Sequence, residues 1–107
     1  MIEDDEVQKA LDWLRDNATD MGRSKERLVK AGHMVKHVKA LQMKRWNEQT
    51  VSAQEREAVA SQAYMDALIE EAQAAGEYEV MKSLREAAAL KIQSWQTMSA
   101  NYRAMKI

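Results

Sequence analysis

Several residue types that would direct a chain toward particular folds or chemistries are missing. The 107 residues include no cysteine, which excludes disulfides, thiolate metal sites and cysteine nucleophiles and is compatible with a reducing compartment. Proline and phenylalanine are also absent, and glycine occurs only three times. The abundant Ala, Glu, Gln, Lys and Met are strong helix formers, and no segment alternates as a strand does. The composition therefore predicts one all-α domain over residues 1–107.

Long hydrophobic runs are missing as well. No run approaches the roughly 18 apolar residues of a membrane-spanning helix, and the acidic residues 3–6 are unlike the start of a signal peptide. We expect no membrane partner and a cytoplasmic location. Neither a phosphate-binding glycine loop nor a carboxylate pair marked by its spacing is present, so catalysis and cofactors are not expected.

Charge is nearly balanced overall but segregated along the chain. The net charge is −1, yet residues 1–22 hold seven acids and two bases, and residues 46–107 hold nine acids and six bases. Residues 23–45 hold eight Lys or Arg against the single acid Glu26, a net charge of +7. This segregation predicts a basic surface that binds polyanions.

The spacing of apolar residues predicts the helices. Residues 4–16 form a short acidic helix, and residues 17–22, rich in capping residues and ending in Gly22, indicate a connector. A basic amphipathic helix follows over residues 23–47, with an apolar sector made of Leu28, Ala31, Met34, Val35, Val38 and Trp46. The acids of the first helix could simply pair with this basic helix.

A long segment of coiled-coil character is predicted over residues 52–105. Ser52 and Glu55 fit a capping box at its start. Gly76 is compatible with a helical hairpin or with one long, gently kinked helix. An unbroken helix would measure roughly 80 Å, too long for a compact monomer to cover. We therefore expect self-association through a stripe spaced by threes and fours, formed by Tyr78, Met81, Leu84, Ala88, Trp95, Met98 and Tyr102.

The basic helix supplies the candidate binding residues. Lys and Arg along one helical face can neutralise successive phosphates, and an aromatic ring can stack on an unpaired base. The predicted nucleic-acid-binding residues are Arg23, Lys30, His33, Lys36, His37, Lys39, Lys44, Arg45 and Trp46. No signature of sequence-specific DNA or RNA readout is present.

Each of these assignments has an alternative. The basic face could be a solvated surface or a dock for acidic segments of a neighbouring subunit, and Trp46 could pack in the core. His33 and His37 have the spacing of helical zinc ligands. However, Met34 occupies the place of the glutamate of the zinc-protease motif, so we interpret the pair as part of the basic face and predict no metal.

The second half of the chain resembles small helical proteins of tailed bacteriophages, some of which are encoded among recombination genes. The residues concerned lie in SAQEREA (52–58), Ala63-Tyr64, LREAA (84–88) and WQTMSANYR (95–103). A basic segment before a long Ala/Glu-rich helix is similar to the UvsY-type recombination mediators. That resemblance implies ring assembly and recombinase loading on single-stranded DNA in the host cytoplasm, with phosphate contacts from Lys30, Lys36, Lys39, Lys44 and Arg45. The acidic first helix has no counterpart in the resemblance.

Two functions are compatible with these observations. The first is a non-catalytic, homo-oligomeric accessory protein that binds single-stranded nucleic acid, with a recombinase or another protein as a further partner. The second is a phage-type helical adaptor or inhibitor that binds a protein through its apolar stripe.

Overall fold

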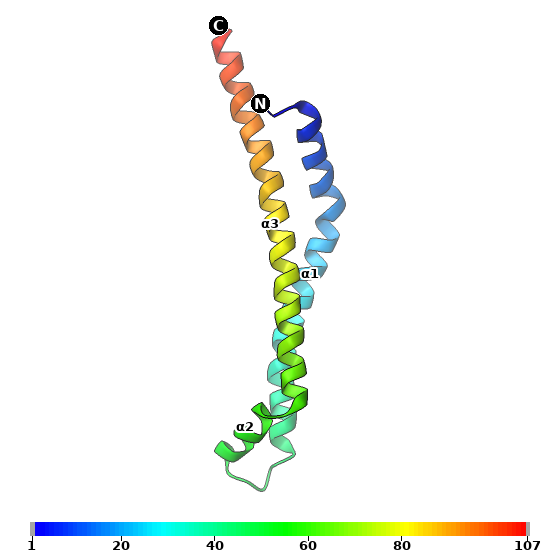
Figure 1. The fold of residues 1–107 in the computed structure, drawn as a ribbon, viewed down its shortest axis with the longest axis vertical. Coiled ribbons are helices and arrows are strands. Elements are labelled where there is room, and N and C mark those ends of the chain that lie inside the picture. The colour runs from blue at the N-terminus through cyan, green and yellow to red at the C-terminus, as the bar shows by residue number, and fades with distance from the viewer. Residues whose placement is uncertain (1, 107) are drawn as a thin grey trace. The chain divides into compact units, whose positions relative to one another are not determined.

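A computed structural model describes residues 2–106 of the chain (Figure 1). These residues form three helices, α1 (Asp4–Lys44), α2 (Val51–Val59) and α3 (Gln62–Met105), and no strand is found among them. The predicted all-α class is confirmed.

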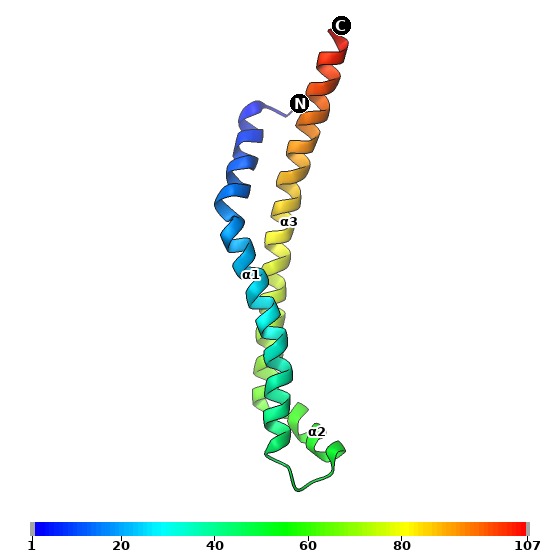
Figure 2. The same ribbon diagram turned by 180° about the vertical axis from the view of Figure 1, so that it is seen from behind.

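The contacts divide the chain into two units. Unit 1 combines the residues up to Gly22 with those from Glu79 onward, and unit 2 runs from Arg23 to Tyr78. In each unit a stretch of α1 lies beside a stretch of α3 that runs in the opposite direction, and unit 2 also contains α2 (Figures 1 and 2).

Small side chains fill the space between the paired helices. Val7, Ala10 and Ala88 are buried in unit 1, and Ala31, Ala58 and Ala74 are buried in unit 2. Within residues 2–106 no large side chain is fully buried. Because these buried side chains are small, each pair of helices buries little apolar surface per residue.

The connector predicted over residues 17–22 is wrong, because α1 continues through it. Asn17 donates its side-chain amide to the carbonyl of Trp13, 2.9 Å away, within the helix. Asn17 and Met21 also line a small hollow with Arg85 of α3, so this part of α1 is packed against its neighbour. Each capping residue, and the glycine, destabilises a helix by only about 1 kcal/mol or less relative to alanine. Packing against a neighbouring helix offsets this cost.

The capping box predicted at Ser52 and Glu55 is also wrong. α1 ends at Lys44 rather than at residue 47, and turns lead to Thr50. Thr50 caps α2, its hydroxyl accepting a hydrogen bond from the backbone N–H of Ala53 at 3.3 Å. The helix therefore begins one residue before Ser52, and Glu55 is directed to another partner.

Ser61 separates α2 from α3, a break that the sequence pattern did not predict. Its hydroxyl donates to the carbonyl of Ala58 at 2.6 Å and accepts from the N–H of Tyr64 at 3.2 Å. One side chain thus serves the end of one helix and the start of the next.

Of the two alternatives for Gly76, the continuous helix is the one observed: Gly76 lies inside α3 and does not have a positive φ.

The continuity of α1 gives a prediction for Gly22→Ala. A Cβ at Gly22 meets no atom within 4 Å, so alanine adds helix propensity without a clash. We expect the free energy of unfolding to rise by about 0.5–1 kcal/mol, measured by urea unfolding followed by circular dichroism. The reverse change at a neighbouring exposed position, Ala18→Gly, should lower it by a similar amount. Destabilisation by Gly22→Ala would show that the chain turns here.

Candidate nucleic-acid interface

A row of cationic and imidazole side chains lies along the outward face of α1 in unit 2. Lys30, His33, His37 and Lys44 recur at helical spacing, and all four are exposed. Residues three or four apart on a helix have Cβ atoms about 5–6 Å apart. The row therefore presents closely spaced charge to the solvent, opposite the buried Ala31.

The predicted residues beside this row are exposed too. Lys36 flanks it on α1, and Arg23 lies one turn before the glutamate Glu26. Within residues 2–106, Lys30, Lys36 and Lys44 form no ion pair, so their charge is not neutralised inside the chain. We call the six exposed residues of α1 the basic face: Arg23, Lys30, His33, Lys36, His37 and Lys44.

Two of the predicted residues lie beyond the end of α1. Arg45 and Trp46 are in the turns that follow Lys44, and Arg45 donates to the side-chain oxygen of Gln42 at 3.4 Å. The helical wheel places Trp46 beside Leu28, but the wheel does not apply once the helix has ended. Trp46 is 41% exposed, so its ring is accessible for stacking.

Lys39 differs from the other predicted phosphate contacts because it has an acidic partner in the chain. Its Nζ lies 2.7 Å from a carboxylate oxygen of Glu55 on α2. This hydrogen bond raises the pKa of Lys39 and lowers the pKa of Glu55. Lys39 therefore joins α1 to α2 and contributes less to the outward charge.

Arg27 is the centre of a second ion-pair cluster, between α1 and α3. Its guanidinium donates to both carboxylate oxygens of Glu70, at 2.8 and 3.0 Å, and to Glu77. The hydrogen bonds from Arg27 lower the pKa of Glu70, and those to the two glutamates raise the pKa of Arg27. Nearby, the Lys25 ammonium lies 4.8 Å from the centre of the Tyr78 ring.

These pairings explain how α1 accommodates seven bases between Arg23 and Lys44. Lys25, Arg27 and Lys39 are held by acids or an aromatic ring. The basic face is exposed, and Lys30 at its edge also lines a hollow with Ala67 and Glu70 of α3. Sequence reasoning did not find the acidic partners, which lie 16 to 50 residues away in the chain. The concentration of acids at the start of α3 was the available signal.

The two histidines do not form part of a larger metal-ligand group. Within residues 2–106 no three His, Cys, Asp or Glu side chains are grouped so that they could hold a metal ion. In the same part of the chain no helix is both long and apolar enough to cross a bilayer.

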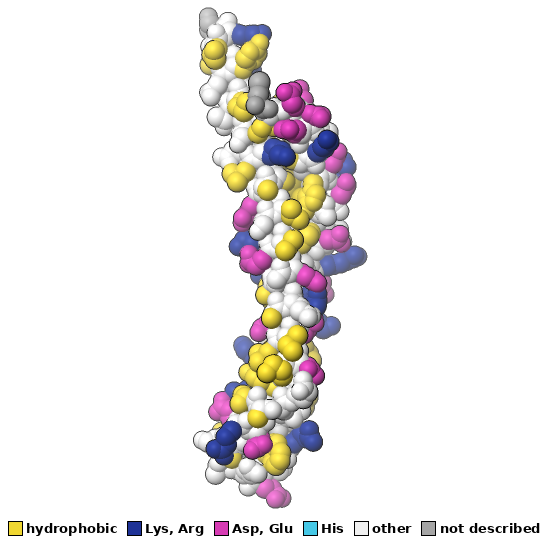
Figure 3. Space-filling model, in the orientation of Figure 1, with side chains coloured by type: hydrophobic (Ala, Val, Ile, Leu, Met, Phe, Trp, Pro, Cys, Tyr) yellow, Lys and Arg dark blue, Asp and Glu magenta, His cyan; other side chains and the backbone are white. Residues whose placement is uncertain are grey.

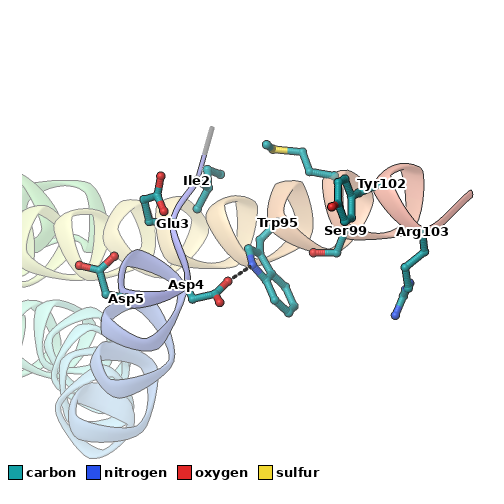
Figure 4. A pocket seen from close by; sticks show the side chains of 9 residues that line it. Ile2, Glu3, Asp4, Asp5, Trp95, Ser99, Tyr102 and Arg103 are labelled. Carbon is teal, nitrogen blue, oxygen red and sulfur yellow. Dashed lines mark hydrogen bonds between the residues drawn. The ribbon is translucent and has the colours of Figure 1, made fainter. Parts of the chain in front are cut away.

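A hollow of about 560 Å³ lies in unit 1 between the start of α1 and the end of α3 (Figure 4). Acidic residues 3–5 line one side, and Trp95, Met98 and Tyr102 line the other. The Trp95 indole N–H donates to a carboxylate oxygen of Asp4 at 2.9 Å. Sequence reasoning did not predict this hollow, because its two sides are about 90 residues apart in the chain.

The stripe predicted to need a second chain is partly covered by α1. Ala88 is buried beside Ala10, and Trp95 is held by Asp4. Leu84 and Tyr102 remain 46% and 54% exposed, and a role for them in an oligomer stays a prediction. Half-buried members of the stripe are Tyr78, Met81, Trp95 and Met98.

No protein-family model, curated protein or solved structure matches the chain.

The Arg27 cluster gives a pH-dependent prediction. Glu70 has a folded-state pKa below its ordinary 4.5, so its pairing stabilises the fold above that value and is lost as the pH falls through the lower folded pKa. Arg27→Gln should therefore lower the urea midpoint at pH 7, with a difference from the native chain that shrinks at pH 3. Lys36→Gln on the same helix is the control and should leave the midpoint nearly unchanged at both pH values. An Arg27 effect of equal size at both pH values would contradict the ion-pair explanation.

Proposed function

We propose that the chain is a non-catalytic, oligomeric accessory protein that binds single-stranded nucleic acid through the basic face. One observation supports this above all: Lys30, Lys36 and Lys44 project from α1 without an ion pair among the described residues, although acids are abundant elsewhere. Phosphates along a strand would neutralise these charges and release counterions.

The end of α1 supplies a second element of the proposed site. Trp46 is 41% exposed directly after Arg45, so a base can stack on the indole while the guanidinium contacts the adjacent phosphate. Stacking needs an unpaired base, which favours single strands over duplexes. Contacts of this kind do not distinguish sequences, and the proposed role is accordingly general: assisting recombination or replication, as in the UvsY-type mediators that the chain resembles.

A helical adaptor or inhibitor of another protein is the second candidate. The exposed apolar side chains Leu84 and Tyr102 favour it, since a partner helix could cover them. Nucleic-acid binding requires the basic face, whereas the adaptor does not.

The first test is fluorescence anisotropy with a labelled single-stranded oligonucleotide and a matching duplex at two salt concentrations. We expect tighter binding to the single strand, with a steep loss of affinity as salt increases. Absence of binding at low salt would refute the nucleic-acid proposal and leave the adaptor as the leading candidate.

Charge reversal locates the binding surface. The triple variant Lys30→Glu, Lys36→Glu and Lys44→Glu should abolish binding, and changing the same residues to Gln should reduce the salt slope by about 2, at roughly 0.7 per phosphate contact. A control triple variant with the same charge change uses exposed bases outside the basic face, namely Lys9, Arg56 and Lys106. Equal losses from the two triple variants would mean that net charge, rather than the basic face, governs binding.

A further inference from the structure

One face of α3 is apolar and left uncovered by the chain itself. In unit 2 it consists of four exposed residues spaced by three or four positions: Met65, Ile69, Ala72 and Gly76. In unit 1 the same spacing gives four more exposed residues: Val80, Ser83, Ala87 and Leu90. We call these eight residues the outer α3 stripe. Its large apolar members are 47% to 61% exposed, and hydrophobic side chains over α3 are visible at the surface in Figure 3.

The outer α3 stripe differs from the stripe predicted from the sequence. The predicted stripe includes Ala88, which is buried, and Trp95, which is hydrogen-bonded to α1. The outer α3 stripe has no charged member, and its large apolar side chains are exposed to water. Ala87, at its edge, also lines a hollow with Ala10 and Trp13 of α1. Exposed apolar surface of this extent along a helix is typical of an interaction site.

Charge along α3 indicates which kind of helix can cover the stripe. Residues 62–81 contain five acids and no base, whereas residues 82–106 contain five bases and one acid. Arg27 engages Glu70 and Glu77, and Asp66 accepts a hydrogen bond from Gln62 at 2.8 Å. If a second α3 runs in the opposite direction, the acidic segment of each copy lies beside the basic segment of the other. A parallel second α3 would instead place segments of like charge side by side.

The stripe is also complementary to itself when reversed. An antiparallel pair of α3 helices related by a two-fold axis between Glu79 and Val80 aligns residues that are equally far from that axis. Three aligned pairs join members of the stripe that are similar in size: Ile69 with Leu90, Ala72 with Ala87, and Gly76 with Ser83. The other two members align with residues outside the stripe, Met65 with Ser94 and Val80 with Glu79.

Gly76 is compatible with this pairing. A glycine within a helix weakens it, yet a Cβ at this position would meet no atom of the chain within 4 Å. The packing of the chain on itself therefore offers no reason for glycine at this place. Close approach of a second helix would account for the glycine, because the pairing sets Gly76 opposite the small residue Ser83 near the centre of the contact.

We propose that the outer α3 stripe binds a second copy of this chain, forming an antiparallel α3–α3 dimer. The inference rests on the proposed function only in that the function calls for an oligomer, since the stripe is separate from the basic face. Forming the dimer buries Ile69, Val80 and Leu90. The interface thus contains large buried apolar side chains, which the interior of each copy lacks.

Light scattering with size-exclusion chromatography tests the dimer. The native chain should have about twice the 12.3 kDa mass of one chain. The double variant Ile69→Gln and Leu90→Gln should weaken the dimer at least about tenfold, because each copy loses two buried aliphatic side chains. The matched control is Val29→Gln with Leu41→Gln on α1, whose side chains are 47% and 50% exposed, and it should remain dimeric. A native mass of 12.3 kDa at tens of micromolar overturns the proposal.

Cysteine cross-linking tests the orientation without background cross-links, because the native chain has no cysteine. Val80→Cys lies near the two-fold axis and should form a disulfide-linked dimer on mild oxidation. Ile69→Cys and Leu90→Cys should cross-link when mixed but not when each is oxidised alone. Cross-linking of Ile69→Cys with itself would indicate a parallel arrangement and overturn the antiparallel dimer.

The same samples separate this inference from the proposed function. Oligonucleotide binding is measured by anisotropy on the native chain and on the basic-face triple variant. A cross-linked Val80→Cys dimer that binds no oligonucleotide supports the interface and refutes the proposed function. Oligonucleotide binding by a native chain that remains monomeric supports nucleic-acid binding and refutes the antiparallel dimer.

Discussion

The close pairing of α1 with α3 through alanine-sized side chains is the constraint on which the rest of the structure depends. Helices that approach through Ala31 and Ala74 leave no room for large residues between them. Bulky apolar side chains are consequently half-buried at the margins or exposed on the outer faces. Polar residues at the margins, with Arg27 foremost, then connect one helix to the other.

This arrangement also determines where positive charge can be used. The inward side of α1 in unit 2 is occupied by α2 and α3, and the cations near that side are bound to Glu55, Glu70 and Glu77. Cations on the opposite side of α1 face the solvent. The basic face on α1 and the outer α3 stripe therefore lie on separate helices, which is what an oligomer that binds a polyanion needs if the two contacts are not to compete.

Composition predicted the helical class correctly because a chain without proline and with three glycines has few ways to leave a helix. The predicted binding residues do not include Lys25 and Arg27, and both have partners inside the chain. The errors came from local signals read without tertiary context. Residues 17–22 suit a connector, but α1 continues through them and α3 packs beside them. The pairing of Lys39 with Glu55 was not predicted, because Glu55 is 16 residues away in the chain. Such long-range pairs have no local signature.

The alanine-lined contact has a consequence for the axial register of the helices. Side chains of nearly equal size fit one another equally well after one helix slides along the other by a turn, so shape alone specifies the register weakly. In unit 2 the register of α1 against α3 is instead fixed by the ion pairs of Arg27 with Glu70 and Glu77. These pairs are exposed to solvent and are screened by salt. Higher ionic strength therefore weakens the contacts that hold α1 and α3 in register in unit 2.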